Sequence, residues 1–435
     1  MISLPMNKPD RILTDGASYR AEKPLVTVNG RAYAWPKHPA VVICFDGCDP
    51  AYIESASAAG AIPAIDRMRR EGFSASALAA MPTFTNPNNI SIVCGVPPTV
   101  HGVSGNFYLD RVSGAEIMMV DATPVRAPTI LAAFSQAGAK VVAVTAKDKL
   151  RKALGHGLDG IAFSAEKANE ATDAENGIAA IGALVGRGAP DQYSADLSLF
   201  VLDAGIRLLE TRRPDLIYLS LSDYVQHKHA PDAPEAIAFM RAVDQRLARL
   251  LALGACLGIV ADHGMNDMAH PNGEPNVVYL GDLLDAAFGA GATRVICPIT
   301  DPFVRHHGAL GGFVRVHLQR AEPSRTTVLN FIRQIPGVCM AVPREEACLR
   351  FELPGDREGD IAVVAGSGVA LGAHARDHDL SQLSGERLRS HGGLAEQVVP
   401  FILSHPLKAE SVEGRAGKPL RNYDVFSVLL NEVEV

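Results

Sequence analysis

Carboxylates and histidines stand directly after several apolar segments of the chain, where they could bind a metal ion. Asp46 follows the apolar run at residues 40–45, and the adjacent Asp262 and His263 follow the run at residues 256–261. A carboxylate at the end of a buried segment is costly unless it is paired or bound to a metal. Asp46 alone is better explained as a helix N-cap. Two ligand types side by side at Asp262 and His263 favour a functional site.

A second group of potential ligands follows the apolar run at residues 216–221. Asp223 and His227 are four residues apart, so in a helical turn they share one face and can bind one zinc ion. An ordinary surface pair explains them equally well. His391 precedes two glycines, which allow the backbone to approach a site closely. His229 points elsewhere in such a helix and is expected in a substrate pocket or at the surface.

Thr85 is the best placed nucleophile in the chain. It lies just ahead of an expected helix that begins before the apolar run at residues 90–93. Free backbone N–H groups and the helix dipole favour an anion at such a position. A threonine hydroxyl there can attack phosphorus if a metal lowers its pKa. Capping by Thr83, Thr85 or Asn86 is the alternative explanation.

Taken together, these motifs supply ligands for two metal ions. The first set is Asp46, Asp262 and His263, and the second set is Asp223, His227 and His391. Three protein ligands are the number expected when a catalytic zinc keeps one position open. Thr85 would supply a further oxygen ligand. Two metals about 4 Å apart can clamp the attacking oxygen and the transferring group together.

The elements that must position these residues alternate between strands and helices. Strands are expected at residues 40–45, 140–144, 216–221 and 256–261, and helices at residues 62–71, 129–136, 197–211 and 235–253. This alternation predicts an α/β fold with a mostly parallel central sheet flanked by helices. Ligands of such sheets collect at the carboxyl ends of the strands, which is where the motifs fall.

The rhythm changes outside this region, which divides the chain into parts. Residues 1–39 are polar and turn-rich and are interpreted as an N-terminal extension with a short strand at 25–28. Residues 40–267 and 389–435 are assigned to a metal-binding catalytic core. Residues 268–388 are assigned to an inserted α+β cap. Short cap strands are expected at residues 276–280, 294–297, 312–317 and 348–352.

Composition limits the partners and the compartment. The 435 residues carry a net charge of −7, which argues against nucleic acid but allows a small anionic substrate in a locally positive site. No secretory signal and no apolar stretch of membrane-span length is recognisable, so no membrane partner is expected. The seven cysteines are scattered without a C-x-x-C pair and are typical of free thiols in a reducing, cytoplasmic compartment. The oligomeric state stays open, with a homodimer as one option.

The order of these motifs resembles the alkaline phosphatase superfamily, in its nucleotide pyrophosphatase/phosphodiesterase branch. Residues 82–106 resemble the nucleophile loop of that branch, with its T-x-P-N and H-G-V elements. The resemblance implies an alkaline phosphatase-like fold, the two ligand sets above for two zinc ions, and Thr85 as the nucleophile. Iron or manganese could replace zinc. It also implies that Asn106 hydrogen-bonds a nonbridging phosphoryl oxygen. A turn residue is the alternative explanation of Asn106, but its position within the motif favours the functional role.

Within this branch the chain resembles the phosphonoacetate hydrolases. The chain is short and has no recognisable leader or anchor, and Lys147 and Lys149 follow the expected strand at residues 140–144. Two lysines there can hold a substrate carboxylate, although a solvated basic turn is the alternative. The resemblance implies cleavage of the C–P bond of phosphonoacetate to acetate and phosphate. Charge left on carbon would pass to the carboxylate, where the lysines would stabilise it.

Other functions remain in view. A nucleotide or lipid phosphodiesterase would need a pocket for a base or headgroup, for which Phe107 and Tyr108 are the candidates. Metal-bound water could attack directly, with Thr85 only a ligand. A sulfatase is disfavoured because no cysteine has the C-x-P-x-R context, and a phosphoglycerate mutase would use serine and manganese. A non-catalytic binding protein is disfavoured because all six ligands and the nucleophile are present.

Overall fold

An eight-stranded sheet forms the centre of the computed structural model, which describes residues 23–111, 113–301, 308–383, 385–415 and 417–434. In spatial order the strands are β20 (Leu420–Arg421), β4 (Phe73–Leu78), β19 (Val398–Leu403), β10 (Cys256–Val260), β3 (Ala40–Cys44), β9 (Leu216–Ser220), β7 (Val141–Thr145) and β8 (Ile161–Ser164). β19 runs antiparallel to both of its neighbours, and the other pairs are parallel. The predicted mostly parallel α/β sheet is confirmed.

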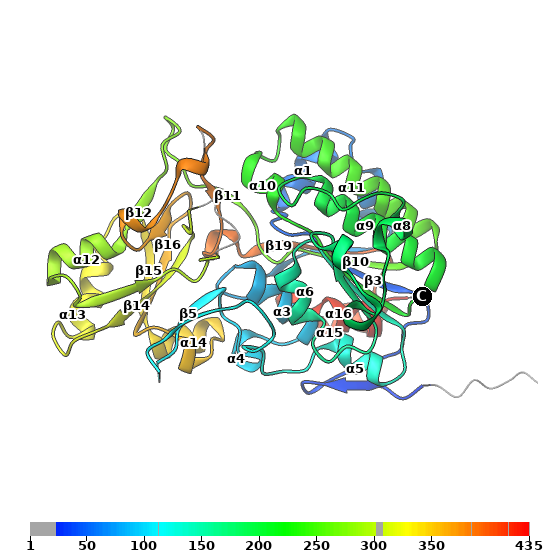
Figure 1. Cartoon of the computed structure of the whole chain (residues 1–435), viewed down its shortest axis with the longest axis horizontal. Coiled ribbons are helices and arrows are strands. Elements are labelled where there is room, and N and C mark those ends of the chain that lie inside the picture. Colours follow the sequence, from blue (N-terminus) through cyan, green and yellow to red (C-terminus); the bar gives the residue numbers. More distant parts are fainter. Residues whose placement is uncertain (1–22, 112, 302–307, 384, 416, 435) are drawn as a thin grey trace, which may run out of the picture.

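Helices cover both faces of this sheet (Figure 1). One face carries α1 (Pro50–Ala58), α2 (Pro63–Glu71), α9 (Asp196–Arg212) and α11 (Pro234–Ala252). The other carries α3 (Thr85–Cys94), α5 (Ile130–Gln136), α6 (Asp148–Leu154) and α16 (Val425–Asn431). The four helices and four strands predicted for the core each agree with the structure to within one residue at either end. The central strands are therefore buried on both faces, as continuous apolar runs require.

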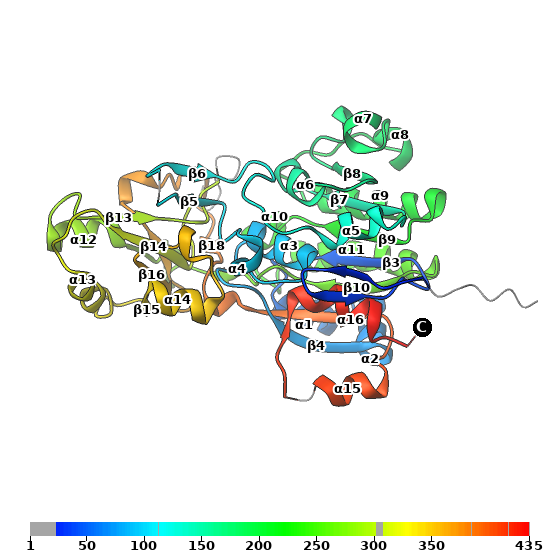
Figure 2. The same cartoon turned by 90° about the horizontal axis from the view of Figure 1, so that it is seen from below.

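A second, smaller sheet stands beside the core and forms a separate lobe (Figure 2). Its strands are β13 (Thr293–Ile296), β14 (Phe313–Leu318), β16 (Ile361–Ala365) and β15 (Val338–Pro343), all antiparallel. The lobe also holds α12 (Leu280–Phe288), α13 (Arg325–Ile332) and α14 (Arg344–Phe351). These elements fall within residues 268–388, so the fold has the predicted α+β insertion. The boundaries drawn from the sequence stay a prediction.

One expected element of this lobe is wrong, and several strands elsewhere in the fold were not foreseen. Residues 348–352 were expected to form a strand, but they belong mainly to α14. Periodicity over so short a run cannot separate the two. Pro343 before the helix and the acidic first turn at Glu345 and Glu346 favour the helix. The sequence pattern did not predict strands β4, β8 and β20, nor the hairpin of β5 (Phe107–Leu109) and β6 (Glu116–Met118).

The register of the parallel strands explains why distant motifs meet. Ser220 on β9 is paired with both Cys44 on β3 and Thr145 on β7, and Cys44 is paired with Val260 on β10. These four strands therefore end at the same level. The residues that follow within three positions are Asp46, Asp262, Asp223 and Lys147. Predicted ligands from three strand ends and one predicted substrate lysine thus share one edge of the sheet.

The remaining predictions on the chain ends and cysteines concern regions away from this edge. Residues 1–22 of the predicted extension lie outside the described residues, and β1 (Val26–Val28) with β2 (Arg31–Tyr33) forms a hairpin after them. All seven cysteines are free, and five of them are buried. Within the described ranges, every helix is too short or too polar to serve as a membrane span.

Candidate metal centre and active site

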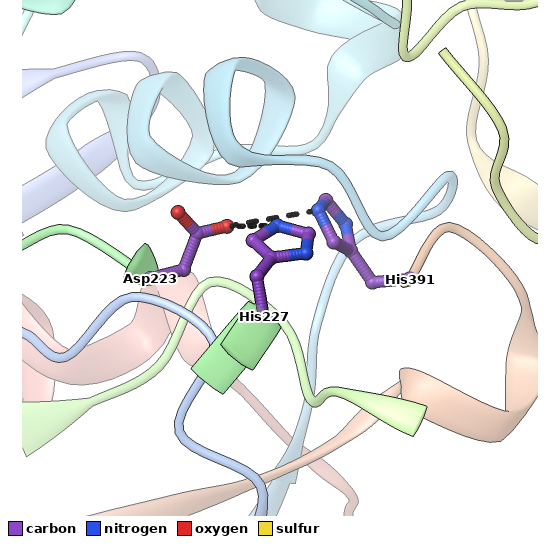
Figure 3. Close-up of side chains that lie close together, drawn as sticks. All are labelled: Asp223, His227 and His391. Carbon is purple, nitrogen blue, oxygen red and sulfur yellow. Dashed lines mark ion pairs between the residues drawn. The ribbon is translucent and has the colours of Figure 1, made fainter. Parts of the chain in front are cut away.

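Asp223, His227 and His391 form one potential metal site at the carboxyl edge of the sheet (Figure 3). Asp223 caps the short helix α10 (Tyr224–Lys228), which carries His227. The Oδ2 atom of Asp223 lies 2.9 Å from Nε2 of His227 and 3.8 Å from Nε2 of His391. His391 arrives from a segment more than 160 residues away in sequence. These three are the second ligand set predicted from the sequence.

Asp46, Asp223 and His263 form a second grouping of ligand atoms. Nε2 of His263 is 3.3 Å from Oδ1 of Asp46 and 3.8 Å from Oδ2 of Asp262. The sequence assigned Asp262 to this set, whereas in the structure Asp223 lies within reach of both sets. Oδ1 of Asp262 accepts backbone N–H groups from Gly47 at 3.2 Å and His263 at 3.1 Å. The ligand roles of all six residues remain predictions.

All three imidazoles are oriented so that Nε2 faces the cluster. Each Nδ1 contacts a backbone carbonyl: His227 that of Arg389 at 2.7 Å, His263 that of Gly264 at 2.9 Å, and His391 that of Thr83 at 2.8 Å. A carbonyl only accepts, so Nδ1 carries a hydrogen and Nε2 is the ring atom left to bind a metal. This arrangement is the one that metal-binding histidines adopt. Nitrogen and carboxylate donors together suit zinc.

Two buried carboxylates, Asp46 and Asp262, and the partly buried Asp223 give this cluster a strongly negative character. Burial, then the charges of Asp223 and Asp262, raise the pKa of Asp46 well above its usual value. Burial also raises the pKa of Asp262. Burial acts to raise the pKa of Asp223 as well, but the imidazoles of His227, His391 and His263 outweigh it and hold that pKa well below its usual value. Such a cluster favours a bound cation.

Thr85 lies against this cluster at the beginning of α3. It is the first residue of the helix, after Phe84 as the N-cap. Its hydroxyl oxygen is 3.2 Å from Nε2 of His263. Thr85 and Asn86 thus occupy the N-terminus of α3, the position at which the sequence predicted an anion site. Thr85 therefore has the position of a nucleophile or of an additional ligand.

A cavity of about 350 Å³ opens over Thr85 and both ligand groupings. Its walls include Asn106, Lys147, Lys149 and the apolar side chains of Val120, Leu150 and Ile299. The amide of Asn106 donates to the carbonyl of Ile299 at 3.2 Å. Its buried Oδ1 atom has no hydrogen-bond partner among the described residues. Asn106 thus lines the same cavity as Thr85, and its role stays a prediction.

The two lysines have different surroundings in this cavity. Nζ of Lys147 donates to the carbonyl of Gln192 at 3.1 Å and lies 5.3 Å from the centre of the Tyr193 ring. Lys149 forms an ion pair with Asp301, and both side chains are about nine-tenths buried. The charge of Lys149 therefore faces a carboxylate, whereas Lys147 contacts an uncharged backbone carbonyl and an aromatic ring. Asp301 carried no signal in the sequence.

His229 does not line the cavity. It ends α10, and its backbone carbonyl accepts the Tyr52 hydroxyl at 2.7 Å. Nδ1 of its half-exposed imidazole is 3.8 Å from the carboxylate of Glu235. Of the two roles expected for His229, the structure supports the surface role and gives no support to substrate binding.

Two further residues shape the loop that carries His391. Gly392 has a φ of +127°, and a Cβ there would lie 2.4 Å from the Phe84 ring, so only glycine fits. The two adjacent glycines in the sequence had predicted that the backbone approaches the site closely here. Glu396 is buried, and its carboxylate accepts the Asn266 amide at 2.6 Å and the Gly393 N–H at 2.8 Å. Glu396 belongs to no motif, so the sequence could not reveal it.

Comparison with known proteins agrees with this geometry. Residues 40–393 match the family described as type I phosphodiesterase / nucleotide pyrophosphatase. The chain belongs to this family. The match extends across most of the core and of the inserted lobe, as the order of the motifs predicted. The family assignment places the chain in the alkaline phosphatase superfamily.

Solved structures provide closer relatives. Phosphonoacetate hydrolase from Sinorhizobium meliloti 1021, in complex with phosphonoformate and with phosphonoacetate, is 48% identical with a TM-score of 0.88. The comparison covers 94% of this chain and 98% of that protein. Murine ectonucleotide pyrophosphatase / phosphodiesterase 5 in complex with AMP shares the fold, with a TM-score of 0.61 and 17% identity over 92% of this chain and 96% of the other. The family and the close relative make this chain a hydrolase.

A curated fungal relative matches a short segment. Phosphonoacetate hydrolase from Penicillium oxalicum is 57% identical over 37 residues, which are 8% of this chain. The match spans about half of that relative's length, 51%. The segment is too short to carry an argument on the whole protein.

Proposed function

We propose that the chain hydrolyses the C–P bond of phosphonoacetate and releases acetate and phosphate. The observation that carries this proposal is one cavity that combines Thr85, a cluster of metal-ligand side chains and two lysines. A phosphonate needs positive charge and a nucleophile, and its carboxylate needs separate cationic donors. The 48% identical phosphonoacetate hydrolase, whose structure contains phosphonoacetate, supports this choice of substrate.

Two zinc ions are the proposed cofactors. Asp223, His227 and His391 would hold one, and Asp46, His263 and Asp262 the other, with Asp223 near both. The orientation of the three imidazoles supports this assignment. When bound, the metals would lower the pKa of the Thr85 hydroxyl and neutralise the phosphonate oxygens. Iron or manganese in place of zinc stays open.

The proposed reaction is a substitution at phosphorus with Thr85 as the nucleophile. Its deprotonated oxygen forms an O–P bond as the C–P bond breaks. The electron pair of the C–P bond passes to the carboxylate, giving an enediolate-like dianion beside Lys147 and Lys149. A proton from water converts this dianion to acetate, and the hydroxide that remains takes up the proton released by Thr85 to re-form water. A further water hydrolyses the phosphothreonine and frees phosphate, so one water is consumed overall. Direct attack by water, with Thr85 only a ligand, is the alternative route.

A substrate panel tests the proposal. Phosphate release from phosphonoacetate is compared with hydrolysis of a phosphodiester, a phosphomonoester and a nucleotide by the zinc-loaded protein. We expect the highest kcat/KM for phosphonoacetate. A higher value for the phosphodiester or the nucleotide would overturn the substrate assignment and leave the metal centre intact.

The role of Thr85 needs a separate experiment. Thr85→Ala should abolish turnover of phosphonoacetate while the zinc content stays near that of the parent protein. Acid quenching during turnover should trap phosphate on Thr85 if the covalent route operates. A Thr85→Ala variant with full activity would remove Thr85 from the reaction, and activity without a trapped phosphothreonine would favour direct attack by water.

The competing phosphodiesterase function lacks one feature in the structure. Neither Phe107 nor Tyr108 lines the cavity, although the sequence made them the candidates for contacting a base or headgroup. Tyr108 is buried under the guanidinium of Arg357, 4.9 Å from its ring centre. Among the residues that the structure describes, the apolar cavity wall formed by Val120, Leu150 and Ile299 has no aromatic member on which a base would stack. A cytoplasmic location, proposed from the free cysteines, fits a small anionic metabolite as substrate.

A further inference from the structure

Asn89 lies beneath the candidate metal centre and uses its whole hydrogen-bonding capacity. Its side chain, on α3, is fully buried. Its Nδ2 donates to the backbone carbonyl of Thr85 at 3.0 Å and to Oδ2 of Asp262 at 3.1 Å. Its Oδ1 accepts the Tyr218 hydroxyl at 2.7 Å and the Ser220 hydroxyl at 2.9 Å. One amide thus joins the nucleophile, a predicted ligand and strand β9.

The chemistry of these partners determines how the amide is oriented. A backbone carbonyl and an ionised carboxylate can only accept hydrogen bonds, so Nδ2 must face Thr85 and Asp262. The opposite orientation would set Oδ1 against two oxygens in a site without water access, which is strongly unfavourable. Hydroxyl groups can donate, so Tyr218 and Ser220 satisfy Oδ1. Tyr218 and Ser220 therefore hold Oδ1 of Asn89, and Nδ2 is left to donate to Thr85 and Asp262.

We propose that Asn89 is a positioning residue that fixes Asp262 and the Thr85 end of α3 in one geometry for metal binding. Oδ1 of Asp262 already accepts two backbone N–H groups, from Gly47 and His263. Asn89 supplies the side-chain donor to Oδ2, the oxygen nearer to Nε2 of His263. Without it, this oxygen loses its anchor and faces the other carboxylates of the cluster. The inference rests on the metal centre of the proposed function but not on the substrate.

The adjacent Asn88 provides a matched control. Its side chain is also fully buried on α3. Its amide bonds both the N–H and the carbonyl of Ala80, at 2.7 Å and 2.9 Å, and donates to the carbonyl of Phe84 at 3.1 Å. Asn422 donates to its Oδ1 at 2.9 Å. Asn88 also donates to the carbonyl of Pro82 at 3.4 Å, so it makes five hydrogen bonds where Asn89 makes four, and none of the five goes to a predicted ligand or to Thr85.

The test compares Asn89→Ala with Asn88→Ala in the full-length chain. Zinc alone is titrated against a chelator to obtain its affinity, and thermal melts of the metal-free proteins report stability. Both variants should melt at lower temperature than the parent. Asn89→Ala alone should bind zinc about 10- to 100-fold more weakly, the usual effect of losing a residue that orients a ligand. Equal zinc affinity in the two variants would overturn the proposal.

Milder substitutions keep the proposal testable if the alanine variants do not fold. Asn89→Asp preserves the shape but turns an acceptor toward Asp262, so zinc affinity should fall at least as far as in Asn89→Ala. Tyr218→Phe and Ser220→Ala leave the amide in place and remove its anchors, so each should cause a smaller loss. Parent-like zinc affinity in Asn89→Asp would overturn the role. Zinc affinity is measured without substrate, so inactivity of the parent toward phosphonoacetate would refute only the proposed function.

Discussion

Lys149 forms an ion pair with Asp301 inside the cavity that the substrate is proposed to occupy. Lys147, two residues earlier, instead donates to the carbonyl of Gln192 and lies over the ring of Tyr193. An ion pair shielded from water has a stronger Coulomb interaction than one at the surface. Loss of Lys149 would leave the Asp301 carboxylate facing an anionic substrate. Lys147 forms no ion pair among the described residues, although its charge acts to lower the pKa of Asp46. The two lysines are therefore not equivalent.

This difference predicts a specific rescue. Lys147→Ala and Lys149→Ala should each lower kcat/KM for phosphonoacetate by about 10- to 100-fold, the range for losing a charged hydrogen bond. Adding Asp301→Asn should recover more activity in Lys149→Ala than in Lys147→Ala, because it removes the exposed carboxylate. Steady-state kinetics of the four variants measures this coupling. Equal recovery of kcat/KM in the two lysine variants would refute this difference. If the lysine variants lose as much kcat/KM for p-nitrophenyl phosphate as for phosphonoacetate, neither lysine binds the substrate carboxylate.

The strand ends were predictable because apolar β-branched runs and their polar exits are local features. Asp46, Asp223 and Asp262 each follow such a run, and parallel register brings the runs level. The geometry between these residues was not predictable. The sequence separates Asp223 from Asp46 and His263, but the structure places the three within ligand distance. That relation depends on how the strand-end turns fold back.

Residues that act through tertiary contacts left no pattern to find. Asp301 is paired with Lys149 across 152 residues of sequence, and Asn89 reaches Asp262 across 173. Asp301 belongs to no motif, and Asn89 lies within the predicted nucleophile loop at residues 82–106, where no role had been assigned to it. The error at residues 348–352 has a different origin, since a five-residue apolar pattern fits a strand and a helix equally. Contacts with the cap core by Ala347 and Phe351 decide it.

Metal removal should destabilise the protein through its three clustered carboxylates. Chelation should lower the melting temperature, and zinc at 100-fold above its Kd should restore about 2.7 kcal/mol. Asp46→Asn removes the carboxyl whose pKa is raised most clearly by burial and by Asp223 and Asp262. We expect this variant to melt higher than the parent when metal-free and to gain less from zinc.

Asp244→Asn is the control for this experiment. Asp244 is buried, and its carboxylate accepts the N–H groups of Ala64 and Ile65 at 3.1 Å and 2.8 Å, outside the cluster. Its loss should lower the melting temperature with and without metal and leave the gain from zinc unchanged. A zinc gain in Asp46→Asn equal to that of Asp244→Asn would exclude Asp46 as a ligand.

A buried ion pair in the cap should support the active-site loop. Arg315 and Glu358 are both fully buried, and Arg315 also donates to the carbonyl of Ser104 at 2.9 Å, two residues before Asn106. Arg315→Met should cost about 3–5 kcal/mol, because it leaves a buried charge unpaired. Adding Glu358→Leu should restore most of this stability, measured by urea unfolding. The double variant should still show a lower kcat/KM, because Ser104 lacks its donor. Full recovery of both the unfolding free energy and kcat/KM would show that the ion pair stabilises the cap and does not support the active site.

His101 should make the fold sensitive to acid. Burial lowers the pKa of His101 to about 3, while its Nδ1 accepts the N–H of Val103 at 3.2 Å and its Nε2 lies 2.8 Å from the Ser91 hydroxyl. An exposed histidine in the unfolded chain has a pKa of about 6.5, so between these values the unfolded state binds the extra proton. Stability therefore rises with pH and is lost as pH falls below about 6.5. Between pH 7.5 and 5.5 this residue should lower the free energy of unfolding by about 1.4 kcal/mol.

His101→Asn should be less stable than the parent at pH 7.5 in urea unfolding. The difference in unfolding free energy between the two proteins should narrow by that amount at pH 5.5. A gap that stays constant over this range would mean that His101 is accessible to protons in the folded protein.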